Sequence, residues 1–408
     1  MARALVVGGG IAGDTLALLL ERDGWAVTVA EIAPAPRQGG QTVDLRGDSR
    51  EVLAEAGLLE QALGCLIPQA GAAWITGRGW RMAAMPVEAF GGQGLVSKEE
   101  LLRTDLARII HDAAGPGVTH RFGETVEALE DRGNRVLARF RTGSEEEFDL
   151  VVGADGAHSK VRALRFGPEE AYRRPLGLAH AWFTLTEKPG TPRLDGWFLM
   201  HNAPGGRSVK ARPGHPGQQE VGLTFTAGTL PSRHDREAQI ALLERTFAGV
   251  GWRAKEFLAA ARDADDFALD TFDQVHMPGW HDGHVVLLGD SAWCASPLSG
   301  LGTALALRGA AELAAALRAH SGADAIPAAL AAFEAAMRPR ATSAQQLPPG
   351  RVAAAAPKTR RGIWLNALVM RAIQSPTLRP LVRRAFAGPG PGRAAKNPSA
   401  QAKTAAVG

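Results

Sequence analysis

Three glycine-containing segments lie far apart along the 408 residues and hold the side chains best suited to chemistry. The first runs from Gly8 to Gly13, the second centres on Asp155, and the third begins at Gly289. Glycines let a backbone come close to a phosphate, and carboxylates accept hydrogen bonds from sugar hydroxyls. These residue types indicate a dinucleotide-binding site, provided that the fold brings the three segments together.

The elements around the first segment are those that such a site needs. Residues 3–7 predict a buried strand, residues 11–23 a helix with one apolar face, and residues 26–30 a second strand. They form a βαβ unit of about thirty residues, the context in which a G-x-G-x-x-G pattern points to a dinucleotide. Glu31, at the end of the second strand, is expected to accept hydrogen bonds from an adenosine ribose.

Each position of the glycine pattern has an expected role. Gly8 permits the tight turn, Gly10 admits a pyrophosphate, and Gly13 lets the helix pack on the strand. The helix start, which includes Ile11 and Ala12, presents free N–H groups and the positive end of the helix dipole to the phosphates.

The second segment ends another predicted buried strand, residues 149–153. Ligands of open parallel sheets lie beyond the carboxyl ends of the strands. Asp155 is therefore expected at the cofactor crevice, and Gly156 allows the sharp turn that follows it.

The third segment follows a last predicted strand at residues 285–288 and leads into a helix at about 302–319. A carboxylate at the strand end can bond a sugar-alcohol hydroxyl, and a loop with few side chains can lie against a planar ring. The N–H groups of the helix start could stabilise negative charge on that ring after reduction. The expected contacts are Gly289, Asp290, Pro297, Gly300, Gly302 and Thr303.

The rest of the sequence predicts a second unit built on an antiparallel sheet. Residues 176–186 and 194–230 alternate apolar and polar types between Gly/Pro turns, and residues 99–114, 236–248, 253–261 and 363–386 predict helices. We expect an α/β protein with a Rossmann-like cofactor domain, an antiparallel substrate domain and a C-terminal helix. The predicted boundaries are 1–73, 97–167 and 276–340 for the cofactor domain, 74–96 and 168–275 for the substrate domain, 341–387 for the helical segment and 388–408 for a disordered tail.

Composition narrows the function classes further. The sequence is 45% hydrophobic and 22% charged, as in ordinary globular proteins, and has no apolar run long enough to span a membrane. Its two cysteines, Cys65 and Cys294, form neither a disulfide framework nor a metal-spaced cluster, so no metal and a cytoplasmic location are expected.

The charge is unevenly distributed along the chain. The net charge is +4, yet residues 338–408 contain thirteen Lys and Arg and no Asp or Glu, so the body of the protein is acidic. The sequence lacks an aromatic-interleaved basic patch elsewhere, and no nucleic-acid partner is expected.

Together the three segments resemble the class A flavoprotein monooxygenases. These include p-hydroxybenzoate hydroxylase-like aromatic and polyketide hydroxylases and tetracycline-inactivating monooxygenases. The resemblance covers residues 1–340 and implies non-covalently bound FAD. It also implies that Arg103 contacts the flavin phosphate or ribityl region, that the loop containing Arg37, Gln41 and Arg46 runs alongside the flavin, and that Arg46 and Pro297 lie near its ring.

The resemblance implies a reaction as well. NAD(P)H reduces FAD and leaves, the reduced flavin forms a C4a-hydroperoxide with O₂, and one oxygen atom passes to a small aromatic or polyketide-like substrate. The protein then supplies orientation and a dry pocket, because the cofactor carries the chemistry. The expected pocket residues, for which core packing is the alternative, are Trp74, Trp182, Trp197, Phe198, Met200 and Phe225.

Other functions of the same fold remain open from the sequence. In a non-redox cyclase or ligand-binding protein, FAD would have only a structural role. A flavin halogenase usually needs an early lysine and a Trp-x-Trp motif, whereas the first lysine here is Lys98 and no such motif occurs. A reductase is a further alternative. The substrate, the choice of NADH or NADPH and the oligomeric state do not follow from the sequence.

Overall fold

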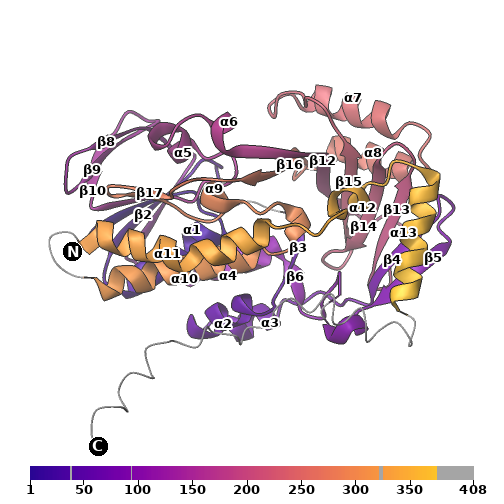
Figure 1. Cartoon of the computed structure of the whole chain (residues 1–408), viewed down its shortest axis with the longest axis horizontal. Helices are drawn as coiled ribbons and strands as arrows, with labels where there is room; N and C mark the ends of the chain where they lie inside the picture. Colours follow the sequence, from indigo (N-terminus) through magenta and orange to yellow (C-terminus); the bar gives the residue numbers. More distant parts are fainter. Residues whose placement is uncertain (37–38, 93, 321–324, 375–408) are drawn as a thin grey trace, which may run out of the picture.

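The computed structural model describes residues 1–36, 39–92, 94–320 and 325–374, which form two units side by side (Figure 1). Each unit is built on one large sheet. The long strands β12 (Arg173–Thr186) and β16 (Ala268–Val275) run from the junction into the second unit. The chain crosses between the units several times, so segments distant in sequence meet at the junction.

The sheet of the first unit has six strands in the order β17-β18-β11-β1-β2-β7, all parallel except the β17–β18 pair. Its central strands are almost entirely apolar because both of their faces are covered. The predicted βαβ unit is present, with β1 paired to β2 around α1. The strands are β1 (Arg3–Val7), β2 (Ala26–Glu31), β7 (Val118–Phe122), β11 (Leu150–Gly153), β17 (His281–Asp282) and β18 (Val285–Leu287).

Helices and a small sheet enclose these strands. One core cluster joins the six-stranded sheet to α10 and α11 and to the three-stranded sheet β10-β9-β8, and a second cluster joins α1, α2 and α4. These elements are α1 (Ile11–Arg22), α2 (Asp48–Glu55), α3 (Leu59–Leu63), α4 (Arg103–Asp112), α5 (Lys160–Arg165), α6 (Glu169–Tyr172), α9 (Asp290–Trp293), α10 (Gly302–Ala319), α11 (Ala325–Gln345), β8 (Val126–Asp131), β9 (Val136–Phe140) and β10 (Glu145–Phe148).

The sheet of the second unit has seven strands in the order β16-β12-β15-β14-β13-β4-β5. Neighbours are antiparallel as expected, except for the parallel pair of β13 and β4. This pair arises because β4 comes from a much earlier part of the chain and joins the sheet beside β13. The strands not yet bounded are β4 (Gly71–Ile75), β5 (Arg81–Pro86), β13 (Trp197–Ala203), β14 (Arg207–Pro213) and β15 (Gln218–Thr226).

The two faces of the seven-stranded sheet have different neighbours. Helices α7 (Arg236–Phe247) and α8 (Ala254–Asp263) pack on one face through Phe247 and Phe257. Helices α12 (Arg351–Ala355) and α13 (Arg360–Ile373) pack against the other face. Side chains alternate between these faces along each strand, so one residue points toward α7 and α8 and the next points toward the face of α12 and α13.

Two elements depart from the predicted boundaries. Residues 99–114 do not form one helix, because β6 (Glu100–Leu102) pairs with β3 (Thr42–Asp44) and α4 begins only at Arg103. β4 enters the seven-stranded sheet at Gly71, three residues before the predicted start of the substrate domain. Apolar spacing alone cannot distinguish a short buried strand from the first turn of a helix.

The C-terminal helix begins earlier than predicted. Thr359 Oγ1 accepts a hydrogen bond from the backbone N–H of Gly362 at 3.0 Å and caps α13. The predicted continuation to residue 386 and the predicted tail at 388–408 lie outside the described residues. No helix in the described ranges is long and apolar enough to cross a membrane.

Candidate functional site

The first and second glycine segments touch through their backbones. Gly8 has φ +107°, and a Cβ atom there would lie 2.4 Å from the carbonyl oxygen of Ala154 and 2.8 Å from the Cα of Asp155. A Cβ on Gly13 would lie 2.0 Å from the carbonyl oxygen of Gly8. Only glycine fits at either position, so these residues set how closely β1, α1 and the loop after β11 approach one another.

The third segment completes the same junction. A Cβ on Gly289, which has φ +67°, would lie 3.1 Å from the Cβ of Ala12. The backbone N–H of Gly156 donates to Ser291 Oγ at 3.0 Å. The three segments predicted to share one site therefore converge at the carboxyl ends of β1, β11 and β18.

A buried arginine that the sequence did not single out holds two of these segments together. Arg162 is fully buried and donates to the carbonyl oxygens of Ser291 at 2.9 Å and Ala157 at 2.6 Å. Burial lowers the pKa of its guanidinium, which the nearby carboxylate of Glu169 opposes. A basic residue on a short helix carries no sequence signal that it is buried.

Asp155 lies just beyond the end of β11, as predicted, and its carboxylate is bonded within the protein. Its carboxylate accepts hydrogen bonds from Ser159 Oγ at 2.5 Å, Lys160 N at 2.7 Å and Val161 N at 3.1 Å. It therefore binds the N-terminus of α5, and burial raises its pKa. The backbone of Asp155 takes part in the junction through its contact with Gly8, whereas its carboxylate is hydrogen-bonded to Ser159 and to the start of α5.

Arg103 lies beside Gly10 and close enough to Asp290 for their charges to interact. Both side chains remain accessible at the surface, although Asp290 is surrounded by protein deeply enough for burial to raise its pKa, with the charge of Arg103 acting in the opposite direction. The Arg103 guanidinium is 3.8 Å from the position of a Cβ on Gly10, and its backbone N–H donates to Gln41 O at 3.0 Å. Accessible side chains of opposite charge that lie close together are suited to holding a polar ligand.

Glu31 lies beside the first segment, at the end of β2. Its carboxylate accepts hydrogen bonds from Gly9 N at 2.8 Å and from Ala33 N at 2.9 Å. The predicted ribose-binding acid is thus next to the glycine turn and helps to fix it. Arg37, expected in the same region, lies outside the described residues.

The loop after α9 exposes bare backbone. Ser296 has φ +71°, unusual for a residue with a side chain, and Gly300 has φ +69°. No atom lies within 4 Å of a Cβ placed on Gly300 or Gly302, and Pro297 is exposed. α10 begins at Gly302, with Thr303 in its first turn, so its N–H groups open toward the same space.

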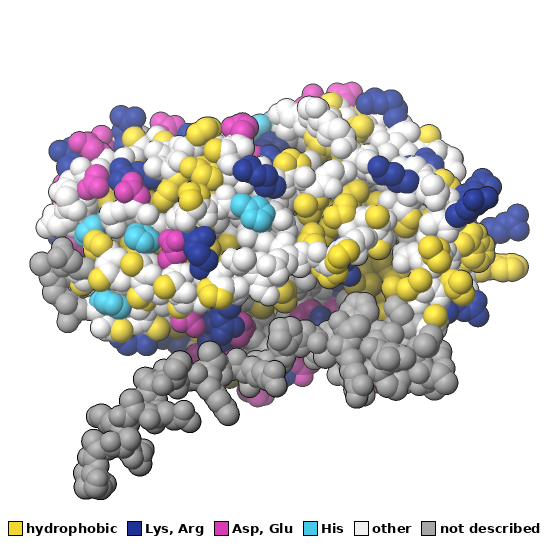
Figure 2. Space-filling view, in the orientation of Figure 1, with side chains coloured by type: hydrophobic (Ala, Val, Ile, Leu, Met, Phe, Trp, Pro, Cys, Tyr) yellow, Lys and Arg dark blue, Asp and Glu magenta, His cyan; other side chains and the backbone are white. Residues whose placement is uncertain are grey.

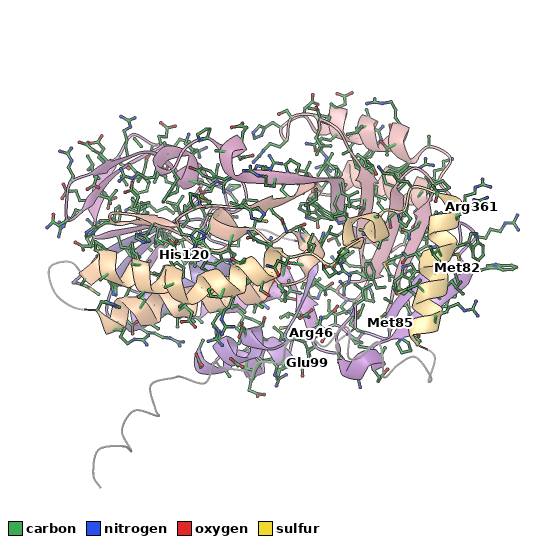
Figure 3. All side chains as sticks on the ribbon, viewed as in Figure 1. Arg46, Met82, Met85, Glu99, His120 and Arg361 are labelled. Carbon is green, nitrogen blue, oxygen red and sulfur yellow. The ribbon has the colours of Figure 1, made fainter. Side chains whose placement is uncertain are left out.

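Four of the expected pocket residues share one face of the seven-stranded sheet. Trp74 and Met200 are paired neighbours in register and are both buried, and Phe198 is partly buried beside them in a cluster that includes Ala367 of α13. Trp182 is on the same face and partly exposed, nearer the junction. Figure 3 labels Met82 and Met85 of β5 beside α13, which covers this end of the sheet.

The other two expected pocket residues lie on the opposite face. Phe225 packs in the cluster beneath α7 and α8, with its ring 6.0 Å from that of Phe247. Trp197 is two residues before Leu199 on β13, so both side chains lie on the same face of the sheet. The guanidinium of Arg81 lies 4.2 Å from the centroid of the Trp197 ring. Strand alternation assigns these residues to packing, because the sequence did not show which face a helix pair would cover.

Arg46 follows β3 and is labelled in Figure 3 in the region between the two units. It pairs with Asp44 at 2.6 Å and donates to the carbonyl oxygens of Gly92 and Gly94. The Asp44 carboxylate raises the pKa of its guanidinium. Arg46 therefore links β3 to the segment before β6.

A buried carboxylate connects the two units. Glu220 Oε2, on β15, accepts hydrogen bonds from Thr42 N at 2.9 Å and Thr42 Oγ1 at 3.0 Å, whereas Glu220 Oε1 has no partner among the described residues. Burial raises the pKa of Glu220 to about 7, against the attraction of Arg212, which pairs with Glu100. No pattern in the sequence singles out Glu220, since its environment depends on contacts between distant segments.

A second unexpected group lies beneath the first segment. Asp14, His111 and His120 have donor atoms within 4.8 Å of one another, and His120 Nε2 is 3.1 Å from Asp14 Oδ1 (His120 is labelled in Figure 3). Within the described residues, this is the group whose spacing could hold a metal ion. The sequence did not reveal it because the three residues come from α1, α4 and β7.

A cleft of about 680 Å³ opens elsewhere at the junction, between Cys65, Asp105 and the turn around His215. None of the predicted site residues that the structure describes lines it. We therefore locate the candidate site at the three converging segments and not at this cleft.

Gly8→Ala tests the backbone junction. The matched control is Gly24→Ala, since Gly24 has φ +85° but no atom within 4 Å of a Cβ. Both changes cost about 1–2 kcal/mol for the left-handed backbone, and Gly8→Ala should cost about 1–3 kcal/mol more through overpacking. Chemical denaturation measures both. Equal losses would mean that the Gly8 contact with Ala154 is not tight.

Glu220→Gln tests the buried carboxyl. A pKa raised on folding means that the native state binds the proton more tightly, so stability is full below about pH 4.5 and falls as the pH rises to about 7. The amide should remove this loss, of about 3 kcal/mol at most, while its oxygen still accepts from Thr42. Denaturation at about pH 4 and about pH 8 should show stabilisation only at the higher pH. A gain independent of pH would contradict this interpretation.

Known proteins share both the sequence and the fold. The family model described as "FAD binding domain" matches residues 1–347. The chain is 37% identical to the uncharacterized protein Rv1260 of Mycobacterium tuberculosis over 78% of this chain and 86% of that protein. It is 33% identical to the FAD-dependent monooxygenase asL4 of Sarocladium schorii, over 78% of this chain and 76% of that protein.

A solved structure extends the similarity over almost the whole chain. The crystal structure of the tetracycline destructase Tet(51) superposes with a TM-score of 0.77 at 25% identity, covering 95% of this chain and 99% of that one. The expected Rossmann-like fold and the expected family are confirmed. The chain is thus a member of the FAD-dependent monooxygenases, oxidoreductases that bind FAD and typically use NAD(P)H as the reductant.

Proposed function

We propose that FAD binds along the groove that starts at Gly10, passes Arg103 and Asp290, and ends at the bare loop from Pro297 to Gly302. The residues present suit the group. Glycine backbone beside the Arg103 guanidinium suits the pyrophosphate, the exposed carboxylate of Asp290 suits the ribityl hydroxyls, and open main chain suits the ring. The observation that carries the proposal is that Asp290 is exposed at the end of β18, where the three segments converge, and is close enough to Arg103 for their charges to interact.

Bound FAD supplies the electron transfer and the activation of O₂ that monooxygenation requires. The chain supplies position and charge. Arg103 neutralises phosphate charge, Glu31 fixes the turn beside the ribose, and the first N–H groups of α10 stabilise negative charge at the loop.

The substrate we propose is a small aromatic or polyketide-like molecule, held between this loop and the Trp182 face of the seven-stranded sheet. α12 bounds the same space, since Val352 packs with Leu298, Leu178 and Phe272. These apolar side chains exclude water, which suits a reaction whose reactive oxygen must not be lost to solvent. Residues 74–96 and 168–275 would then serve as the substrate domain, and a cytoplasmic location remains part of this proposal.

Isotope labelling tests the activity. Purified protein is supplied with FAD, NADH or NADPH, ¹⁸O₂ and a panel of phenols and polyketide-like aromatics. We expect substrate-dependent oxidation of the nicotinamide and one ¹⁸O atom in the product. A product formed without the label would overturn the monooxygenase proposal and favour a structural role for FAD.

Asp290→Ala tests the cofactor groove. Loss of a carboxylate that holds the ribityl hydroxyls should lower FAD occupancy at least about tenfold, measured from flavin absorbance after gel filtration. Asp265→Ala, an exposed residue beyond α8, is the control and should keep wild-type occupancy. Full occupancy in Asp290→Ala, with an unchanged melting temperature, would mean that the flavin lies elsewhere.

A further inference from the structure

A chain of polar side chains crosses the face of the seven-stranded sheet on which α12 and α13 pack. Lys210 Nζ, on β14, donates to Thr224 Oγ1 of β15 at 3.0 Å, and this oxygen is 2.7 Å from His180 Nδ1 of β12. Thr224 is fully buried and His180 nearly so. Burial holds the pKa of His180 well below its usual value, so the ring is neutral and Lys210 carries the charge.

Backbone register and one glycine shape this chain. Lys210 is opposite Gly222, and a Cβ on Gly222 would lie 2.6 Å from Cε1 of His180. The missing side chain therefore makes room for the imidazole. The His180 ring also packs 5.4 Å from Phe272 and 5.8 Å from Trp182, so its orientation is fixed from both sides.

Lys210 has no acidic partner. Among the described residues it forms no salt bridge, and one hydrogen bond to Thr224 leaves two of its ammonium N–H groups available. The charge of Arg351 of α12, a second cation, acts on it, and Arg351 Nε donates to Leu298 O at 3.1 Å. A largely enclosed cation without a carboxylate is costly to maintain, which is typical of a site where a ligand provides the charge.

The ammonium faces the proposed substrate space. Lys210 and Trp182 are each partly buried, so part of both side chains stays accessible. Its neighbour Arg351 is bonded to the loop that starts at Pro297, so both cations lie between that loop and the sheet. Apolar side chains gather around α12 at the same place (Figures 1 and 2).

We infer that Lys210 and Arg351 form a subsite for an ionised oxygen, a phenolate, enolate or carboxylate, on the aromatic substrate. This assignment rests on the proposed function for the location of the substrate. A charge-assisted hydrogen bond from Lys210 fixes one end of the molecule, and Trp182 and Phe272 flank its apolar part. A neutral analogue would leave the charges of partly buried Lys210 and of Arg351 without an anionic partner, so the subsite selects for charge.

The charge of Lys210 gives the subsite a pH dependence. Burial and the repulsion from Arg351 lower the pKa of Lys210 to about 8. The ammonium is therefore fully charged below about pH 8 and loses its proton as the pH rises above that value. Two groups face Lys210: neutral His180 from β12 and charged Arg351 from α12. Further along β14 and β15 lie Arg212 and Glu220, a cation and an acid whose charges are opposite in sign.

Calorimetric titration of the FAD-loaded protein tests this subsite without turnover. The probes are benzoate with benzamide, and 4-cyanophenol with 4-cyanoanisole, so each anion has a neutral counterpart of similar shape. We expect at least one anion to bind about tenfold or more tightly than its counterpart at about pH 7.5, and the preference of benzoate to fall at about pH 9.5. The pair that discriminates identifies the carboxylate or the phenolate as the ligand.

Variants separate charge from folding. Lys210→Met should abolish the preference while keeping FAD occupancy, Lys210→Arg should keep the preference and remove its decline at high pH, and Arg351→Met should weaken it. Lys255→Met, on the exposed surface of α8, is the matched control and should behave as wild type. Equal binding of anions and neutral counterparts by wild type, or an intact preference in Lys210→Met, overturns the subsite, whatever the labelling experiment shows.

Discussion

The contact of Gly8 with the backbone of Ala154 and Asp155 is the constraint on which the site depends. A side chain at Gly8 would occupy the space of the loop after β11, and one at Gly13 would occupy the space of Gly8 itself. With both absent, α1 starts directly over β1, and Gly289 brings the third segment against Ala12. Arg103 and Asp290 come close to Gly10 and to each other because these three backbones meet.

The polar side chains around this junction divide into two kinds. Those of Asp155 and Arg162 form hydrogen bonds with neighbouring loop and helix groups and serve to hold the loops. Asp290 is exposed and Lys210 is partly exposed, so both keep accessible surface. Burying an unsatisfied polar group is costly. We therefore expect the polar side chains that keep accessible surface to bind a ligand, and those that are hydrogen-bonded within the protein to maintain the fold.

The sequence predicted the first unit well because its signals are local. The βαβ unit, the strands ending at Gly153 and Leu287 and the glycine loops each follow from spacing within about thirty residues. The pocket was predicted less well. Phe225 and Trp182 both lie on strands of alternating pattern, and only the packing of α7 and α8 decides which of them faces the cofactor unit.

Lys210 shows most clearly what lies beyond sequence reasoning. A lysine on a strand of the second unit is ordinarily a solvated residue, and nothing in Ser208-Val209-Lys210 suggests otherwise. Its environment depends on α12, which is distant in sequence and packs over the same face of the sheet while Arg351 bonds to Leu298. Because α12 lies between the sheet and the loop after α9, it brings a second positive charge close enough to act on the lysine. The chemistry proposed for this pocket is therefore a consequence of how the C-terminal segment packs.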